Sequence, residues 1–85
     1  MAYSVVVLDA ALKQLRQVPK ADRTRIRARI DALAEDPRPA GAKKLRAREN
    51  LWRIRSGDYR IIYSIKDERL LVLVIRIGHR REVYR

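Results

Sequence analysis

Cysteine is absent from this sequence, so neither disulfides nor thiolate metal ligands can stabilise its fold. That absence fits a reducing compartment. Only one histidine is present, and one histidine without cysteine makes no recognisable metal cluster. Glycine-rich phosphate loops and serine–histidine–aspartate triads are missing too. We therefore expect neither a metal nor another cofactor.

Long hydrophobic runs are equally scarce. The longest, Leu70 to Ile75, falls far short of the roughly 20 residues that a membrane-spanning helix needs. The start, Met1 to Ala10, lacks the basic region, long apolar stretch and cleavage site of a signal peptide. We expect a cytoplasmic protein with no membrane contact. Its 85 residues, 47% of them hydrophobic, suffice for a single domain spanning residues 1–85.

Acidic residues are in short supply. Ten Asp and Glu stand against 21 Lys and Arg, which gives a formal net charge of +11. A chain so charged repels itself, and the excess indicates an anionic partner: nucleic acid, a membrane surface or an acidic protein. The alternative is that the arginines merely solvate the surface.

The N-terminal half predicts one strand and two helices. Tyr3 to Leu8 is rich in β-branched residues, which is typical of a strand. Asp9 offers an N-cap for a helix over Ala10 to Val18. A second helix is expected from about Ala21 to Glu35, because apolar residues recur on one face. It should end at Asp36-Pro37, because the residue before a proline avoids helical angles. The two helices should form an antiparallel hairpin.

The C-terminal half changes to a period of two. After a basic loop, Arg38 to Asn50, we expect three strands joined by short turns: Leu51 to Arg55, Tyr59 to Lys66 and Leu70 to Ile77. The last is apolar on both faces and should lie centrally. The order β-α-α-β-β-β predicts an α+β fold, with the helical hairpin on one face of a small, largely antiparallel sheet.

Arginines cluster around the predicted turn at Gly57-Asp58. A two-residue turn would place Arg55 directly opposite Arg60 and bring Arg53 to the same face of the hairpin. Like charges in that position cost up to about 1 kcal/mol, and a bound polyanion would reverse the sign. A three-residue turn would instead move Arg60 to the other face. Outward-pointing arginines that repel weakly in water are the structural alternative.

The C-terminal tail and the basic loop add further candidates. The tail holds the only histidine, His79, two adjacent arginines and Tyr84. A lone histidine is more often a surface residue than a catalyst, and Tyr84 could be only an apolar anchor. The candidates for RNA binding outside the hairpin are Lys43, Lys44, Arg46, Arg48, His79 and Arg81.

Four short segments follow one another in a specific order. Each alone is a weak sign of a family, but the ordered series is a strong one. The chain thereby resembles the RelE branch of the RelE/ParE toxin superfamily, on Lys44-Leu45-Arg46, Leu51-Trp52-Arg53-Ile54-Arg55, Gly57-Asp58-Tyr59-Arg60 and Gly78-His79-Arg80-Arg81-Glu82-Val83-Tyr84. The resemblance covers nearly the whole chain, since the expected elements also follow that family's order.

The resemblance implies the toxin of a type II toxin–antitoxin system. Such toxins are ribosome-dependent endoribonucleases that cut messenger RNA in the decoding site. The 2′-hydroxyl of the RNA attacks the neighbouring phosphate and leaves a cyclic phosphate and a free 5′-hydroxyl. The implied partners are the ribosome, messenger RNA and an acidic, RelB-like antitoxin.

The resemblance also implies roles for five residues. Arg53 and Arg55 fall on the family's basic pair, Arg60 on its phosphate-binding arginine, Arg80 on its second catalytic arginine and Tyr84 on its terminal tyrosine. Arg81 could replace Arg80, because the tail is shorter here than in well-known members. The basic pair is often lysine in the family, and arginine holds its proton too tightly to be a free base.

Two other functions share parts of this pattern. A ParE-like toxin would have the same fold and poison DNA gyrase without cutting RNA. A non-catalytic module could bind RNA or the ribosome surface, but few aromatics interleave with the basic residues, as a stacking platform would require. Ribosomes programmed with a short message would separate the three.

Overall fold

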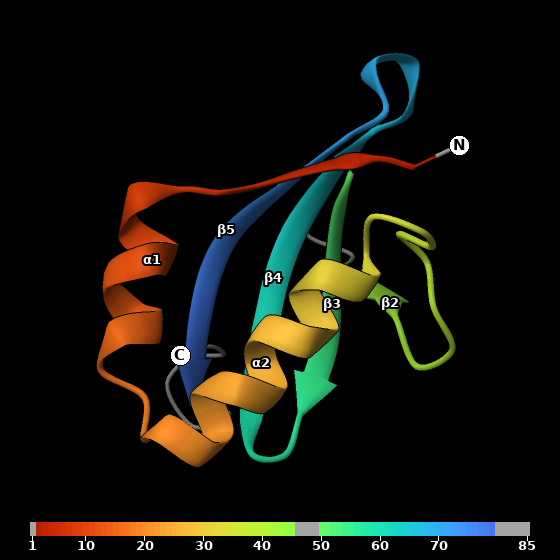
Figure 1. Cartoon of the computed structure of the whole chain (residues 1–85). Coiled ribbons are helices and arrows are strands. Elements are labelled where there is room, and N and C mark those ends of the chain that lie inside the picture. Colours follow the sequence, from red (N-terminus) through yellow and green to blue (C-terminus); the bar gives the residue numbers. More distant parts are fainter. Residues whose placement is uncertain (1, 46–49, 80–85) are drawn as a thin grey trace.

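A computed structural model describes residues 2–45 and 50–79 of the chain. Two helices lie on one face of a five-stranded sheet (Figure 1). The elements are β1 (Ser4–Val7), α1 (Asp9–Arg16), α2 (Lys20–Ala32), β2 (Lys43–Lys44), β3 (Leu51–Ser56), β4 (Tyr59–Lys66), a 3₁₀ turn η1 (Asp67–Arg69) and β5 (Leu71–His79). The predicted α+β class, with the helices on one face, is confirmed.

The sheet has the strand order β1-β5-β4-β3-β2. β1 runs parallel to β5, and the other pairs are antiparallel, so the sheet is largely antiparallel as predicted. β5 lies between β1 and β4, which makes it an interior strand, although β4 is the middle one. The prediction of a plain loop over 38–50 was wrong in part, because β2 pairs there with Arg53 and Trp52 of β3.

Four element boundaries also differ from the predictions. Asp9 is the first residue of α1, and the N-cap is Leu8, whose side chain makes no capping bond. Asp9 still favours the helix, because an acid in the first turn complements the helix dipole. α1 and α2 both end before the predicted residues. Leu70 was predicted to begin the last strand, but its φ of 50° places it in the turn after η1.

The core lies between the helices and the sheet. α1 packs against β5, and α2 packs against β3. The buried apolar side chains of the described residues are Ala11, Leu15, Val18, Ile26, Ile30, Leu33, Ile54, Ile61, Tyr63, Ile65, Val72, Val74 and Ile77. Strand side chains alternate between faces, so each buried residue of β3 and β4 has neighbours that point away from the helices.

A β-bulge in β5 keeps its apolar side chains in the core. Val74 and Ile77 are both buried although they lie three residues apart. The register shifts between Ile62 and Tyr63 of β4, which leaves Ile75 as an extra residue in β5. The extra residue turns Ile77 back towards the helices, where simple alternation would have pointed it away.

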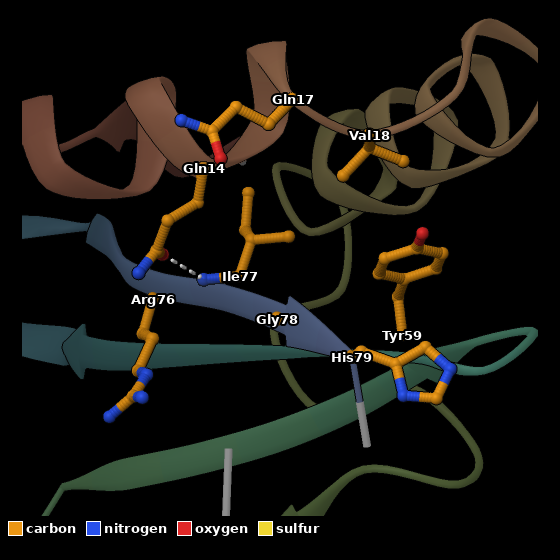
Figure 2. A pocket seen from close by; sticks show the side chains of 8 residues that line it. All are labelled: Gln14, Gln17, Val18, Tyr59, Arg76, Ile77, Gly78 and His79. Atoms are coloured by element: carbon orange, nitrogen blue, oxygen red, sulfur yellow. Dashed lines mark hydrogen bonds between the residues drawn. The ribbon is translucent and has the colours of Figure 1, made fainter. Parts of the chain in front are cut away.

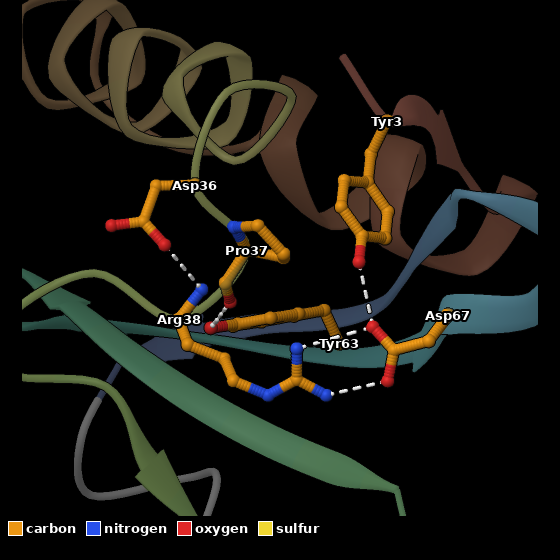
Figure 3. Close-up of polar contacts among 6 residues, drawn as sticks. All are labelled: Tyr3, Asp36, Pro37, Arg38, Tyr63 and Asp67. Carbon is orange, nitrogen blue, oxygen red and sulfur yellow. Dashed lines mark hydrogen bonds and ion pairs between the residues drawn. The ribbon is translucent and has the colours of Figure 1, made fainter. Parts of the chain in front are cut away.

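A polar cluster ties three distant segments together at the η1 end of the sheet (Figure 3). The Tyr3 hydroxyl donates to Asp67 Oδ1 at 2.6 Å, and Arg38 donates to both carboxylate oxygens at 3.2 and 2.8 Å. The Arg38 guanidinium also lies over the ring of Trp52, 5.2 Å from its centroid. Hydrogen bonds lower the pKa of Asp67 to about 2, with the larger effect from Arg38 and the smaller from Tyr3.

Candidate functional site

The hairpin between β3 and β4 has the predicted two-residue turn. Ser56 pairs with Tyr59, and Arg55 pairs with Arg60 directly across the turn. Gly57 has a φ of 59° while Asp58 is not among the residues with positive φ, which is the pattern of a type II′ turn. The register that the arginine prediction required is therefore confirmed.

The same register sets the face on which the arginines lie. Ile54 pairs with Ile61, and both are fully buried under the helices. Because side chains alternate along a strand, Arg53, Arg55 and Arg60 belong to the opposite face of the sheet. We call this helix-free side of the sheet the open face.

Two further cations join this group through the sheet. Lys43 of β2 pairs with Arg53, and Arg76 of β5 pairs with Ile62, which is itself the partner of Arg53. In Figure 2, Arg76 extends from β5 away from α1. Four adjacent strands therefore contribute basic side chains to the open face.

Acidic residues are absent from the strands that the structure describes. None of the strand residues is Asp or Glu, whereas seven are basic: Lys43, Lys44, Arg53, Arg55, Arg60, Lys66 and Arg76. The acids described by the structure lie in helices, turns and loops. No acidic side chain from the strands can neutralise the arginines of the open face, so this face suits an anion.

Arg53 is the least accessible of these arginines. Its exposed fraction is only 6%, and its Nε atom is buried without a hydrogen-bond partner among the described residues. A buried donor left unsatisfied costs about 1–3 kcal/mol, and more for a charged group. Arg55 is exposed, and Arg60 is half-buried. A phosphate oxygen would supply the acceptor that the Arg53 guanidinium lacks.

The structure does not bring every candidate to the open face. Lys44 pairs with Trp52, which packs against the core, so the alternation directs Lys44 to the helix side. His79 pairs with Tyr59, and the two rings meet edge to face at 5.7 Å. Lys44 and His79 therefore lie on the helix side of the sheet, away from the open face, and their RNA-binding role stays a prediction.

His79 and Tyr59 line a hollow of about 340 Å³ beside the end of α1 (Figure 2). Here β1 no longer covers β5, and the side chain of Gln14 takes its place: its Oε1 accepts a hydrogen bond from the Ile77 amide at 2.7 Å. The hollow is therefore at a strand edge that a glutamine partly caps. The remaining candidates lie outside the described residues: Arg46, Arg48, Arg80, Arg81 and Tyr84.

Two basic residues of the site were missed from the sequence. Arg76 was overlooked because the last strand was treated as apolar on both faces, although a single charge in such a strand was a usable signal. Arg29 lies on α2, and its Nε donates to the carbonyl oxygen of Arg55 at 3.2 Å. No sequence spacing relates Arg29 to Arg55, because the two residues are brought together only by the packing of α2 on β3.

The described residues contain no group of three or more His, Cys, Asp or Glu that could hold a metal ion. Within the same residues, neither helix has the length and apolar character needed to cross a membrane.

The chain is similar to known toxins over almost its whole length. The mRNA interferase toxin RelE of Escherichia coli K12 is 35% identical over 88 residues, which are 99% of this chain and 92% of that protein. Toxin RelG of Mycobacterium tuberculosis is 30% identical over 100% of this chain and 99% of its own length. The archaeal RelE–RelB complex from Pyrococcus horikoshii has a TM-score of 0.84 at 30% identity, with coverage of 98% of this chain and 100% of that chain.

The sequence pattern of one family spans almost the whole chain. It is described as the ParE toxin of the type II toxin–antitoxin system parDE, and it matches residues 5–84. Together with the relatives of 30% identity or more, this match shows that the chain belongs to the RelE/ParE family of type II toxins.

Proposed function

We propose that this toxin is an endoribonuclease that cuts messenger RNA in the decoding site of the ribosome. The observation that carries the proposal is the open face, where Arg53, Arg55 and Arg60 come together on neighbouring strands that contain no acid. The name of its Escherichia coli relative, an mRNA interferase, supports the same activity.

The reaction needs alignment and charge neutralisation more than a deep pocket. The 2′-hydroxyl attacks the adjacent phosphorus, the bond to the 5′-oxygen breaks, and a cyclic phosphate and a 5′-hydroxyl result. The nucleophile, phosphorus and leaving oxygen must lie in line, which the ribosome can impose on the codon it holds. Guanidinium groups supply paired donors to phosphate oxygens and stabilise the charge of the pentacoordinate transition state.

Each arginine of the site has its own role in this reaction. Arg60 and Arg80 hold and neutralise the scissile phosphate, and Tyr84 orients the RNA by stacking or hydrogen bonding. Arg53 and Arg55 fix the backbone and stabilise charge. Because an arginine side chain holds its proton too tightly to act as a base, the proton of the 2′-hydroxyl goes to water, to Tyr84 or to a ribosomal group.

The same basic surface favours an acidic antitoxin. A net charge of +11 would otherwise direct the free toxin to any RNA. The partner that fits is RelB-like, with a helix and an extended arm that covers the open face or displaces the tail. The complex of RelE with RelB from Pyrococcus horikoshii supports this kind of partner.

Single-turnover cleavage on purified ribosomes programmed with a short message tests the function. We expect the wild-type protein to cut the codon in the decoding site, and Arg60→Ala to lower the rate by about 10²–10³, the usual effect of removing one electrostatic stabiliser. Thermal unfolding of the variant shows whether it is folded. An intact message with the wild-type toxin would contradict the proposal.

A second candidate is inhibition of DNA gyrase, which the ParE description of the matching family favours. The same fold would then serve a different target, since fold does not dictate function. Gyrase supercoiling in the presence of the toxin tests this alternative. Inhibition of gyrase together with intact message would select the ParE-like activity.

A further inference from the structure

A basic hollow lies at the edge of β3, next to the open face. Its volume is about 260 Å³, and it is lined by Arg29, Gly41, Lys43, Arg53 and Arg55. Among the described residues, β2 pairs only with Trp52 and Arg53, so no described strand lies beside the outer edge of β3 at Arg55. Four of the five lining residues are cations and none is an acid. We call this place the β3-edge hollow.

Arg29 connects the hollow to the helix layer. Its Nε donates to the Arg55 carbonyl oxygen at 3.2 Å, which caps a strand edge that would otherwise be unpaired. A guanidinium has five N–H donors, so this bond leaves the terminal NH groups available to a ligand. The arginine is thereby oriented by the protein before any ligand arrives.

Arg53 gives the independent indication that an anion belongs here. Its side chain is more than nine-tenths buried, and the Nε atom has no acceptor among the described residues. Its neighbours in the hollow, Arg29 and Lys43, are donors and cannot accept from it. An anion with several oxygen acceptors would satisfy Arg53 and offset the mutual repulsion of the four cations.

We propose that the β3-edge hollow binds a non-scissile phosphate of the RNA backbone, with Arg29 and Lys43 as its ligands beside Arg53. The proposal rests on the proposed function, because the RNA strand that reaches the arginines of the open face continues to this edge. Arg53 and Arg55 belong to the open face and also line the β3-edge hollow. An RNA strand can therefore pass from the open face to the hollow without leaving basic surface. Arg29 is then a phosphate-binding residue that fixes the position of the strand.

A purely structural role for Arg29 is the competing explanation. In that case its bond to Arg55 holds α2 against β3, and any substitution acts through stability. Arg29→Lys separates the two roles. Lysine keeps the charge for a phosphate but lacks the fixed guanidinium fork that reaches the Arg55 carbonyl.

Binding of a short, single-stranded RNA oligonucleotide, measured by fluorescence anisotropy over a range of salt concentrations, tests the proposal without relying on cleavage. Each lost phosphate contact lowers the salt slope of the affinity by about 0.7 for a single strand. We expect this decrease for Arg29→Gln, a largely restored slope for Arg29→Lys, and no change for Arg27→Gln. Arg27 is an exposed arginine on the same helix and serves as the matched control.

Cleavage on programmed ribosomes gives the second measurement. A residue that holds the strand equally in the ground and transition states should affect half-saturation and not the rate at saturation. We expect Arg29→Gln to raise the half-saturating concentration about tenfold, with a saturated rate within about twofold of wild type.

Several outcomes would overturn the inference. Equal salt slopes of the RNA affinity for Arg29→Gln and Arg27→Gln would mean that Arg29 contributes only its share of the net charge and binds no particular phosphate. An Arg29→Lys variant as defective as Arg29→Gln would leave only the structural role. Weaker antitoxin binding with unchanged RNA binding would assign the hollow to a carboxylate of the antitoxin. If the wild-type toxin fails to cut but the slopes differ as expected, the endoribonuclease proposal fails and the phosphate site stands.

Discussion

By the resemblance to RelE toxins, Arg53 falls on a basic pair where a lysine could act as a general base, whereas an arginine is a poor proton acceptor. If Arg53 acts through its charge, lysine should replace it. We expect Arg53→Lys to cut within about tenfold of the wild-type rate, or faster, because lysine gives up a proton more readily. Single-turnover cleavage on programmed ribosomes measures this effect.

The opposite pattern would change the mechanism. An inactive Arg53→Lys variant, combined with normal cleavage by Arg60→Ala and Arg80→Ala, would mean that guanidinium geometry at Arg53 is central. Arg53 is buried, so a lysine in its place has little room to turn out into solvent. The comparison therefore tests the chemical group at this position and not a change in where the side chain lies.

Tyr63 is fully buried and brings a hydroxyl group into the apolar core. Its hydroxyl donates to the Pro37 carbonyl at 2.7 Å, and burial raises the pKa of Tyr63 to about 12. We expect Tyr63→Phe to lower the free energy of unfolding by about 1–2 kcal/mol, because a buried acceptor loses its partner. Urea unfolding measures the change. A variant as stable as the wild type would show that water or another donor satisfies Pro37.

The β3–β4 hairpin is the element on which the arginine register depends. Gly57 has a φ of 59°, and a Cβ there would meet no atom within 4 Å. Gly57→Ala should therefore destabilise through backbone strain and not through a clash, by about 1–2 kcal/mol. Asp58→Ala in the same turn should change stability by less than about 0.5 kcal/mol. Equal stability of both variants in urea unfolding would refute the turn assignment.

The η1 turn is held by a carboxylate whose pKa is lowered to about 2, mainly by hydrogen bonds from Arg38. A lowered pKa means that Asp67 stabilises the fold above its ordinary value of 3.8 and loses this effect as the pH falls towards 2. We expect Asp67→Asn to lower the melting temperature at pH 7, with a difference from wild type that shrinks between pH 4 and 2. Glu68→Gln, next to it, is the control. A difference independent of pH would contradict the ion pair.

At the scale of the whole molecule, the excess of positive charge should govern the choice of partner. We expect the affinity for the cognate antitoxin to fall several-fold between low and physiological salt, because screening weakens contacts between exposed charges. Apolar contacts, for example to Val6, which is 44% exposed, should retain part of the affinity. Titration calorimetry at several salt concentrations measures this. A complex indifferent to salt would exclude a charge-driven antitoxin interface.

Local sequence determined the parts of this protein that depend on neighbours in the chain. A two-residue turn at Gly57-Asp58 pairs Arg55 with Arg60 and puts Arg53 on the same face, because a hairpin register follows from its turn. The sequence predicted this turn and left a three-residue turn as the alternative, which the structure excludes. The order of the elements, the helix-covered face and the basic character of the site followed in the same way.

Only the tertiary structure decided the features that join distant segments. β2 has two residues in a segment without periodicity, so its pairing with β3 left no pattern to read. Leu70 turns with a positive φ, and Ile75 bulges, because strand pairing across the sheet requires it. The contact of Arg29 with Arg55 and the burial of Arg53 arise when α2 packs on β3, and no local propensity encodes a meeting of side chains so far apart in the chain.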